Sequence, residues 1–119
     1  MQEPSRKTVA TQEAGAWVIQ FVDNDILDEL SIARLGEELD GLIGRMQRPM
    51  LVLDFANVAH MSSSALGMLI TLLKKVQEAN GAMRLCNIRP VIRQVFEITK
   101  LADLFEIHES RSAALARLV

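Results

Sequence analysis

Several residue types are scarce in this sequence of 119 residues, and each scarcity removes a class of protein from consideration. Cys86 is the only cysteine, so no internal disulfide can form and nothing indicates an oxidising compartment. The chain has no tyrosine and few other aromatic residues, which disfavours a site that stacks the bases of single-stranded nucleic acid. A formal net charge of −2 leaves no basic surplus for a nucleic-acid backbone. We therefore expect no nucleic-acid partner.

Long hydrophobic runs are also missing. The most apolar stretch, over residues 65–73, is too short to span a bilayer and is interrupted by Gly67 and Thr71. Residues 1–16 contain no apolar segment of signal-peptide length. We therefore expect a cytoplasmic protein that does not insert directly into a membrane.

What the sequence does contain is enough apolar material for one core. Half of the residues are hydrophobic, and the length suits one domain. We expect a single domain over residues 8–119, preceded by a flexible polar segment over residues 1–7.

The hydrophobic pattern alternates between strands and helices. Two short strands over 8–12 and 17–22, separated by a turn at Gly15, should form an antiparallel hairpin. The nearly continuous apolar run over 50–55 is typical of a central parallel strand covered on both faces. Further strands are predicted over 82–88 and 104–107, and helices over 28–46, 62–80, 89–99 and 109–118. This order predicts an α/β fold with a mixed, mostly parallel sheet of about five strands and about four helices.

Apolar residues at helical spacing indicate which face of each helix is buried. In the helix over 28–46 they are Ile32, Leu35, Leu39, Leu42, Ile43 and Met46. In the helix over 89–99 the residues available for the core are Val91, Val95, Phe96 and Ile98.

The most informative stretch follows the strand at 50–55, where a loop leads to Ser62, Ser63 and Ser64 at the start of a helix. Ser62 is predicted to be the N-cap, whose hydroxyl accepts a backbone N–H bond and contributes about 1 kcal/mol. Capping needs only one serine, so the other two would project from the first helical turn. A phosphate there would meet exposed N–H groups and the positive end of the helix dipole, and would add a charge of roughly −1.5 to −2.

This segment resembles the signature of STAS domains of the anti-sigma factor antagonist type, in which Asp-Ser-Ser/Thr-Gly-Leu-Gly follows a short loop. Residues 62–67, Ser-Ser-Ser-Ala-Leu-Gly, occupy those positions. By this match Ser63 corresponds to the family's phosphorylated serine, and Ser64 is the second candidate. Residues 95–107 resemble the late helix, the turn and the Leu-Phe-x-Ile strand of the same family. The resemblance extends in element order over residues 8–118 and implies the STAS fold.

The resemblance also implies a protein-binding regulator in bacterial signal transduction and transcription. In such antagonists the unphosphorylated domain binds an anti-sigma serine kinase and frees the sigma factor. The kinase inactivates the domain by phosphorylation, and a phosphatase restores it. The chain would then be a kinase substrate and not an enzyme, with no catalytic residue. The implied docking surface joins the loop after the second strand to the start of the Ser63 helix, and comprises Asp23, Asn24, Asp25, Ser62, Ser63, Ser64 and, on the outer face, Met68.

Two alternatives remain open. Ser62 stands where the family has Asp, and Ala65 where it has Gly, which favours a non-phosphorylated STAS scaffold or structural subunit of a multiprotein complex, such as a lipid-transport assembly. The other alternative is a response-regulator receiver phosphorylated on Asp54, with Asp23 and Asp25 as its acidic pair. No lysine follows the last predicted strand, which disfavours the receiver.

No other motif points to a site. His60, Cys86 and His108 are far apart in sequence, and zinc needs several ligands at workable spacing. No Gly-rich phosphate loop or nucleophile elbow occurs, so we expect no metal site and no cofactor. Cys86 is expected to pack as a small hydrophobe within its strand.

Overall fold

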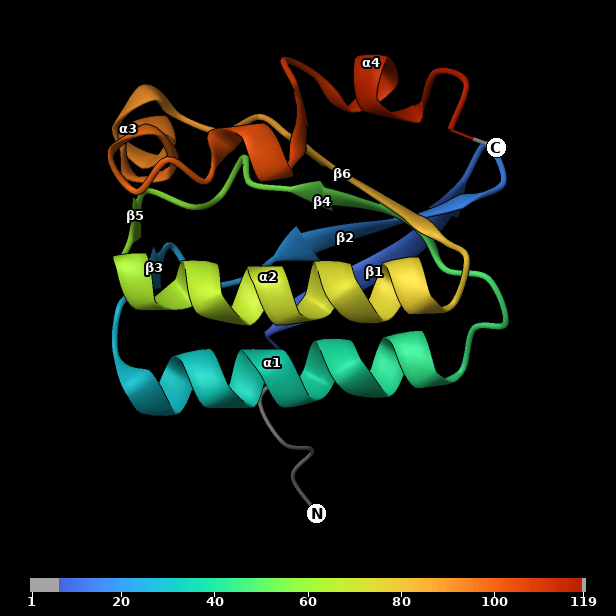
Figure 1. Cartoon of the computed structure of the whole chain (residues 1–119), viewed down its shortest axis with the longest axis horizontal. Coiled ribbons are helices and arrows are strands. Elements are labelled where there is room, and N and C mark those ends of the chain that lie inside the picture. The colour runs from blue at the N-terminus through green and yellow to red at the C-terminus, as the bar shows by residue number, and fades with distance from the viewer. Residues whose placement is uncertain (1–6, 119) are drawn as a thin grey trace.

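Figure 1 shows a computed structural model of the chain, which describes residues 7–118. The main sheet has five strands in the order β1-β2-β4-β6-β7. They are β1 (Thr8–Glu13), β2 (Ala16–Phe21), β4 (Met50–Asp54), β6 (Ala82–Cys86) and β7 (Glu106–His108). β1 pairs antiparallel with β2, and the other neighbours pair parallel. The predicted mixed, mostly parallel sheet is confirmed. The flexible segment predicted over 1–7 lies, except for Lys7, outside the described residues.

The β1–β2 hairpin turns through Ala14 and Gly15, whose φ angles are 52° and 81°. Positive φ at both central residues is the mark of a type I′ turn, which matches the right-handed twist of the two strands. Gly15 adopts this conformation without steric strain, whereas the Cβ of Ala14 opposes it.

Helices cover both faces of the sheet. The described helices are α1 (Glu29–Gly44), α2 (Ser63–Glu78), α3 (Pro90–Ile98), the 3-10 helix η1 (Ala102–Leu104) and α4 (Arg111–Leu115). α1 and α2 lie side by side against one face, and α4 contacts β4, β6 and β7 on the other (Figure 1). Within residues 7–118, no helix has both the length and the apolar character needed to cross a membrane.

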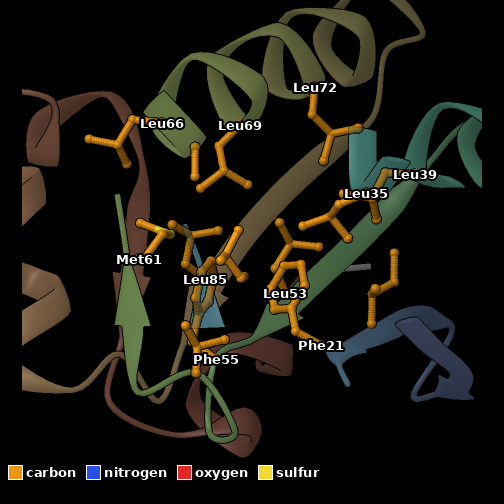
Figure 2. Close-up of a cluster of buried hydrophobic side chains, with 14 of the residues drawn as sticks. Phe21, Leu35, Leu39, Leu53, Phe55, Met61, Leu66, Leu69, Leu72 and Leu85 are labelled. Carbon is orange, nitrogen blue, oxygen red and sulfur yellow. The ribbon is translucent and has the colours of Figure 1, made fainter. Parts of the chain in front are cut away.

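The main core lies between the sheet and the helix pair α1 and α2. Leu53 and Leu85 of the sheet point toward Leu69 of α2, with Leu35 and Leu39 of α1 beside them (Figure 2). A smaller cluster on the opposite face is formed by Ala16, Val18, Met50, Val52, Cys86, Ala114 and Leu118. Because both faces are covered, all five residues of β4 are buried, as the continuous apolar run predicts.

The core-facing residues predicted for α3 are partly wrong. Val91 is 53% exposed and Ile98 is 80% exposed, while Ile92 and Phe96 are buried. Ile92 and Phe96 are four residues apart and so share one face of the helix, which packs inward. The two exposed residues are seven apart and fall together on another face.

Two boundaries near the C-terminus also differ from the prediction. β7 begins at Glu106 instead of residue 104, because Leu104 closes η1 and Phe105 turns inward against Phe96, with ring centroids 5.6 Å apart. α4 covers only Arg111–Leu115 of the helix predicted over 109–118.

Candidate functional site

A second, two-stranded sheet organises the region around the serines. β3 (Asp25–Ile26) pairs in parallel with β5 (His60–Met61), where the sequence pattern predicts only loops. The buried side chains of Ile26 and Met61 hold the two strands against the core. Each strand has only two residues, too few for a periodic signal, so this pairing could not be predicted from the sequence.

Backbone hydrogen bonds tie the loop after β2 to the approach of α2. The carbonyl of Asn24 accepts from the N–H groups of Ala59 and His60 at 2.8 and 3.1 Å, and the carbonyl of Ile26 accepts from Ser62 at 3.0 Å. His60 Nδ1 lies 2.8 Å from Asp25 Oδ1. The structure therefore brings together the two segments that the sequence assigns to one docking surface.

The three serines have different surroundings. Ser62 occupies the N-cap position of α2 with extended φ and ψ, but its hydroxyl makes no capping hydrogen bond. Its Oγ is buried and has no hydrogen-bond partner among residues 7–118. Ser63 and Ser64, the first two residues of the helix, are exposed. The prediction that the Ser62 hydroxyl caps the helix is therefore wrong, while the other two hydroxyls project from the first turn as expected.

Met68 does not lie on the outer face of α2. Its side chain is half-buried and packs against the core formed with α1. A Cβ added to Gly36 of α1 would come within 3.1 Å of Met68 Cγ, so the two helices are in close contact there. Met68 therefore belongs to the α1–α2 contact and not to the surface around Ser63.

The start of α1 lies at the same end of the molecule as the start of α2 (Figure 1) but differs in its polar contacts. The Asp28 carboxylate accepts from the Ser31 N–H at 3.1 Å, and hydrogen bonds from Ser31 lower the pKa of Asp28. Glu29 adds a second acid to this first turn, whereas the first turn of α2 contains no acid. The positive end of the α2 dipole is thus left without a negative side chain in its own first turn.

The 23–25 loop and the start of α1, at the same end of the molecule as the start of α2, carry acidic and apolar side chains (Figure 1). In the 23–25 loop, Asp23 pairs with Lys7 at 2.8 Å and is half-buried, while Asn24 and Asp25 are exposed. Leu27 and Leu30, which continue from this loop into α1, are 50% and 60% exposed. These two leucines were not predicted as surface residues of the site. For Leu30 the signal is that a leucine occurs at a helix position outside the stripe of Ile32 and Leu35, whereas Leu27 precedes the helix and has no periodic signal.

A second polar cluster lies at the end of β4. The Asp54 carboxylate is 3% exposed and accepts hydrogen bonds from the Ala56 N–H at 2.9 Å and Asn87 Nδ2 at 3.0 Å. The guanidinium of Arg111 lies 2.9 Å from the same carboxylate and 3.0 Å from Glu13. Arg111 is far from Asp54 in sequence, and no pattern marks it as a partner.

Competing effects determine the pKa of Asp54. Burial raises it, but hydrogen bonds from Asn87, Ala56 and Arg111, together with the Arg111 charge, outweigh burial and lower it. Cys86 packs beside this cluster, and burial followed by the nearby Asp54 charge raises the pKa of its thiol to about 12. A buried carboxylate with these partners presents no open oxygen to a phosphate donor, and this disfavours the receiver alternative.

Comparison with known proteins gives a consistent result. A family model described as the STAS domain matches residues 8–114. BtrV of Bordetella bronchiseptica, named as a candidate anti-sigma factor antagonist, is 29% identical over 91 residues, which are 76% of this chain and 78% of that protein.

Solved structures share the fold. An anti-sigma-factor antagonist (STAS) domain protein from Planctomyces limnophilus superposes with a TM-score of 0.84 at 21% identity, over 93% of this chain and 97% of its own. The anti-sigma factor antagonist SpoIIAA in its unphosphorylated form gives a TM-score of 0.74 at 17% identity, over 93% of this chain and 95% of that one. SpoIIAA from Bacillus has also been solved in the phosphorylated form, which gives a TM-score of 0.65 at 16% identity, over 94% of this chain and 99% of that one.

Proposed function

The chain belongs to the STAS domain family, and from that premise we propose that it is a bacterial regulator of the anti-sigma factor antagonist type, switched by phosphorylation of Ser63. It binds protein partners and is not itself an enzyme. Its partners are an anti-sigma serine kinase, which it binds when unphosphorylated, and a phosphatase that removes the phosphate. The setting is cytoplasmic signal transduction that ends in transcription regulation.

The observation that carries this proposal is the position of the Ser63 hydroxyl. Ser63 is exposed at the first position of a helix of 16 residues, and the neighbouring 23–25 loop is tied to the same end by the β3–β5 pairing. A kinase can therefore reach the hydroxyl from solvent, and a bound partner would cover the loop and the serine together.

The physical effect of the phosphate follows from the charges around it. The first turn of α2 has no acid and no side-chain cap, so the positive end of its dipole would favour a phosphate on Ser63. The added charge of roughly −1.5 to −2 would also lie at the same end of the domain as the exposed Asp25 carboxylate, which the β3–β5 pairing and its contact with His60 hold there. A partner that covers this end would have to desolvate both negative groups, which favours its release.

Names of the similar proteins support the same function. BtrV is named as an anti-sigma factor antagonist candidate, and SpoIIAA has been solved with and without phosphate. Ser64 is also exposed and is the second candidate phosphorylation site. It projects from the next position of the helix, about 100° around the axis from Ser63.

A specific observation keeps the scaffold as the second candidate function. The residue before Ser63 is Ser62, whose hydroxyl is buried, so this position offers no surface carboxylate to a kinase. A kinase that reads an acid there would not recognise this chain. The domain would then serve as a non-phosphorylated structural subunit of a multiprotein complex.

Incubation of the chain with its cognate anti-sigma kinase and ATP, followed by phosphopeptide mass spectrometry, tests the proposal. We expect phosphate on Ser63, complete loss of the label in Ser63→Ala, and retention in the matched control Ser64→Ala. Label on Asp54 would instead identify a receiver. Absence of label from wild type, with label gained in Ser62→Asp, would identify the scaffold and locate the reason in Ser62.

A further inference from the structure

A cavity of about 370 Å³ is lined by residues of the β1–β2 turn, the last turn of α1 and the segment that follows the helix. This end of α1 is opposite to the serine site (Figure 1). This volume falls in the range of small-molecule pockets. The apolar side chains of Trp17 on β2, Leu42 on α1 and Met46, just after the helix, line it. Met50 at the start of β4 lies at its edge, although its side chain packs in the cluster on the opposite face of the sheet. Methionine side chains are flexible and polarizable, so this wall can adapt to an unbranched chain.

Two arginines make the cavity electropositive. Arg45 and Arg48 line it, and its lining includes no acidic residue. Neither arginine has an ion-pair partner among residues 7–118. Arg48 Nε donates to the carbonyl of Asn80 at 2.9 Å, which fixes the side chain and leaves both terminal nitrogens of the guanidinium available. A planar guanidinium held in this way can donate two parallel hydrogen bonds to a carboxylate.

We propose that this cavity binds a free amphipathic carboxylate with an unbranched acyl chain. The chain would lie against Trp17, Leu42 and Met46, and the carboxylate would be held by Arg45 and Arg48. The apolar wall accounts for the chain and the unpaired positive charges account for the acid. The site is distinct from the surface around Ser63, and it does not depend on the function proposed for that surface.

Trp17 is the only tryptophan and the chain has no tyrosine, so intrinsic fluorescence reports on this cavity directly. The proposed probe is decanoate below its micellar concentration. Acetate is the control for a carboxylate without the acyl chain, and decanol is the control for the alkyl chain without the carboxylate. We expect a saturable shift in Trp17 emission with decanoate, and binding at least about tenfold weaker for acetate and for decanol. Calorimetry of the same titrations measures binding independently of the fluorophore.

Variants test the two parts of the site. Arg45→Gln combined with Arg48→Gln should weaken decanoate binding by about tenfold or more while leaving decanol unchanged. Arg34→Gln is the matched control, because Arg34 is exposed on α1 and does not line the cavity. Leu42→Phe should reduce decanoate binding by filling the cavity, with circular dichroism confirming the fold.

Three results would overturn the proposal. They are no binding of decanoate by either method, equal binding of decanol and decanoate, or a loss of decanoate binding in Arg34→Gln as large as that in the double arginine variant. Binding to phosphatidylglycerol vesicles without binding to free decanoate would assign the arginines to a lipid headgroup instead and would also overturn it.

Discussion

The two polar clusters on either side of the 55–62 loop are built differently. At the end of β4, the buried Asp54 carboxylate has three protein partners, and Arg111 extends the network to Glu13. At the start of α2, the Ser62 hydroxyl is buried without a partner, the first turn has no acid, and Ser63 and Ser64 face solvent.

This difference indicates that the two clusters have different roles, one in the stability of the fold and one in partner binding. The Asp54 network joins β4, the residue after β6, and α4, so it holds the C-terminal helix against the sheet. The serine end lacks the local contacts that usually stabilise a helix start. We infer that the Asp54 cluster contributes folding free energy, whereas the serine end is left open for a partner or a phosphate.

Removal of Arg111 should give the largest effect on stability. Arg111→Ala leaves the buried Asp54 charge without its ion pair, and we expect a loss of roughly 3 kcal/mol in the free energy of unfolding. Urea denaturation measures the loss. Arg93→Ala is the control, because within residues 7–118 Arg93 makes only an exposed pair with Glu97 and should change stability by less than about 0.5 kcal/mol. Equal losses of unfolding free energy in the two variants would contradict a special contribution of the Asp54 network to stability.

The pH dependence of this network is the next test. The pKa of Asp54 is lowered in the folded state from its ordinary value of 3.8. The folded state therefore binds this proton less readily than the unfolded chain, and the stabilisation is present at neutral pH and is lost as pH falls through the folded pKa, below about 4. The stability difference between wild type and Asp54→Asn should shrink in that range. A constant difference between pH 7 and pH 3 would contradict this account.

The two N-cap serines provide a matched comparison of smaller size. Ser110 Oγ accepts from the Ala113 N–H at 3.1 Å at the start of α4, so Ser110→Ala should lower the free energy of unfolding by about 1 kcal/mol. Ser62→Ala should change it by less than about 0.5 kcal/mol, because no capping bond is lost and a buried unpaired hydroxyl is removed. Thermal unfolding of both variants checks this, and a larger loss for Ser62→Ala would show that its hydroxyl does act as a cap.

A modest stabilising effect is expected away from both clusters, in the β1–β2 turn. Ala14 has a φ of 52°, and Asn-Gly is the preferred sequence for a type I′ turn. Ala14→Asn should raise the free energy of unfolding by roughly 0.5–1 kcal/mol without affecting partner binding. A decrease in thermal midpoint would argue against the I′ assignment.

Long elements were predictable from the sequence because their signals are local. The apolar run of β4 and the end of α2 just before Asn80, which has a φ of 59°, follow from residues close in the chain. The five-stranded sheet follows from the alternation of such elements, and the family resemblance located the serine region.

The rest depends on contacts between distant residues. The β3–β5 pairing joins segments of two residues each, and Asp54 meets Arg111 across more than half of the domain. The burial of the Ser62 hydroxyl and the inward position of Met68 depend on how α2 packs against α1 and the core. Sequence spacing alone contains no information about these contacts.

The central claim, that charge at Ser63 controls partner binding, is tested most directly by calorimetry with the cognate anti-sigma kinase. Ser63→Ala should bind with nearly wild-type affinity, and Ser63→Glu should bind more weakly by roughly 1–3 kcal/mol. Ser64→Glu serves as the control for a charge at the neighbouring position. Equal affinity of Ser63→Ala and Ser63→Glu would contradict the switch.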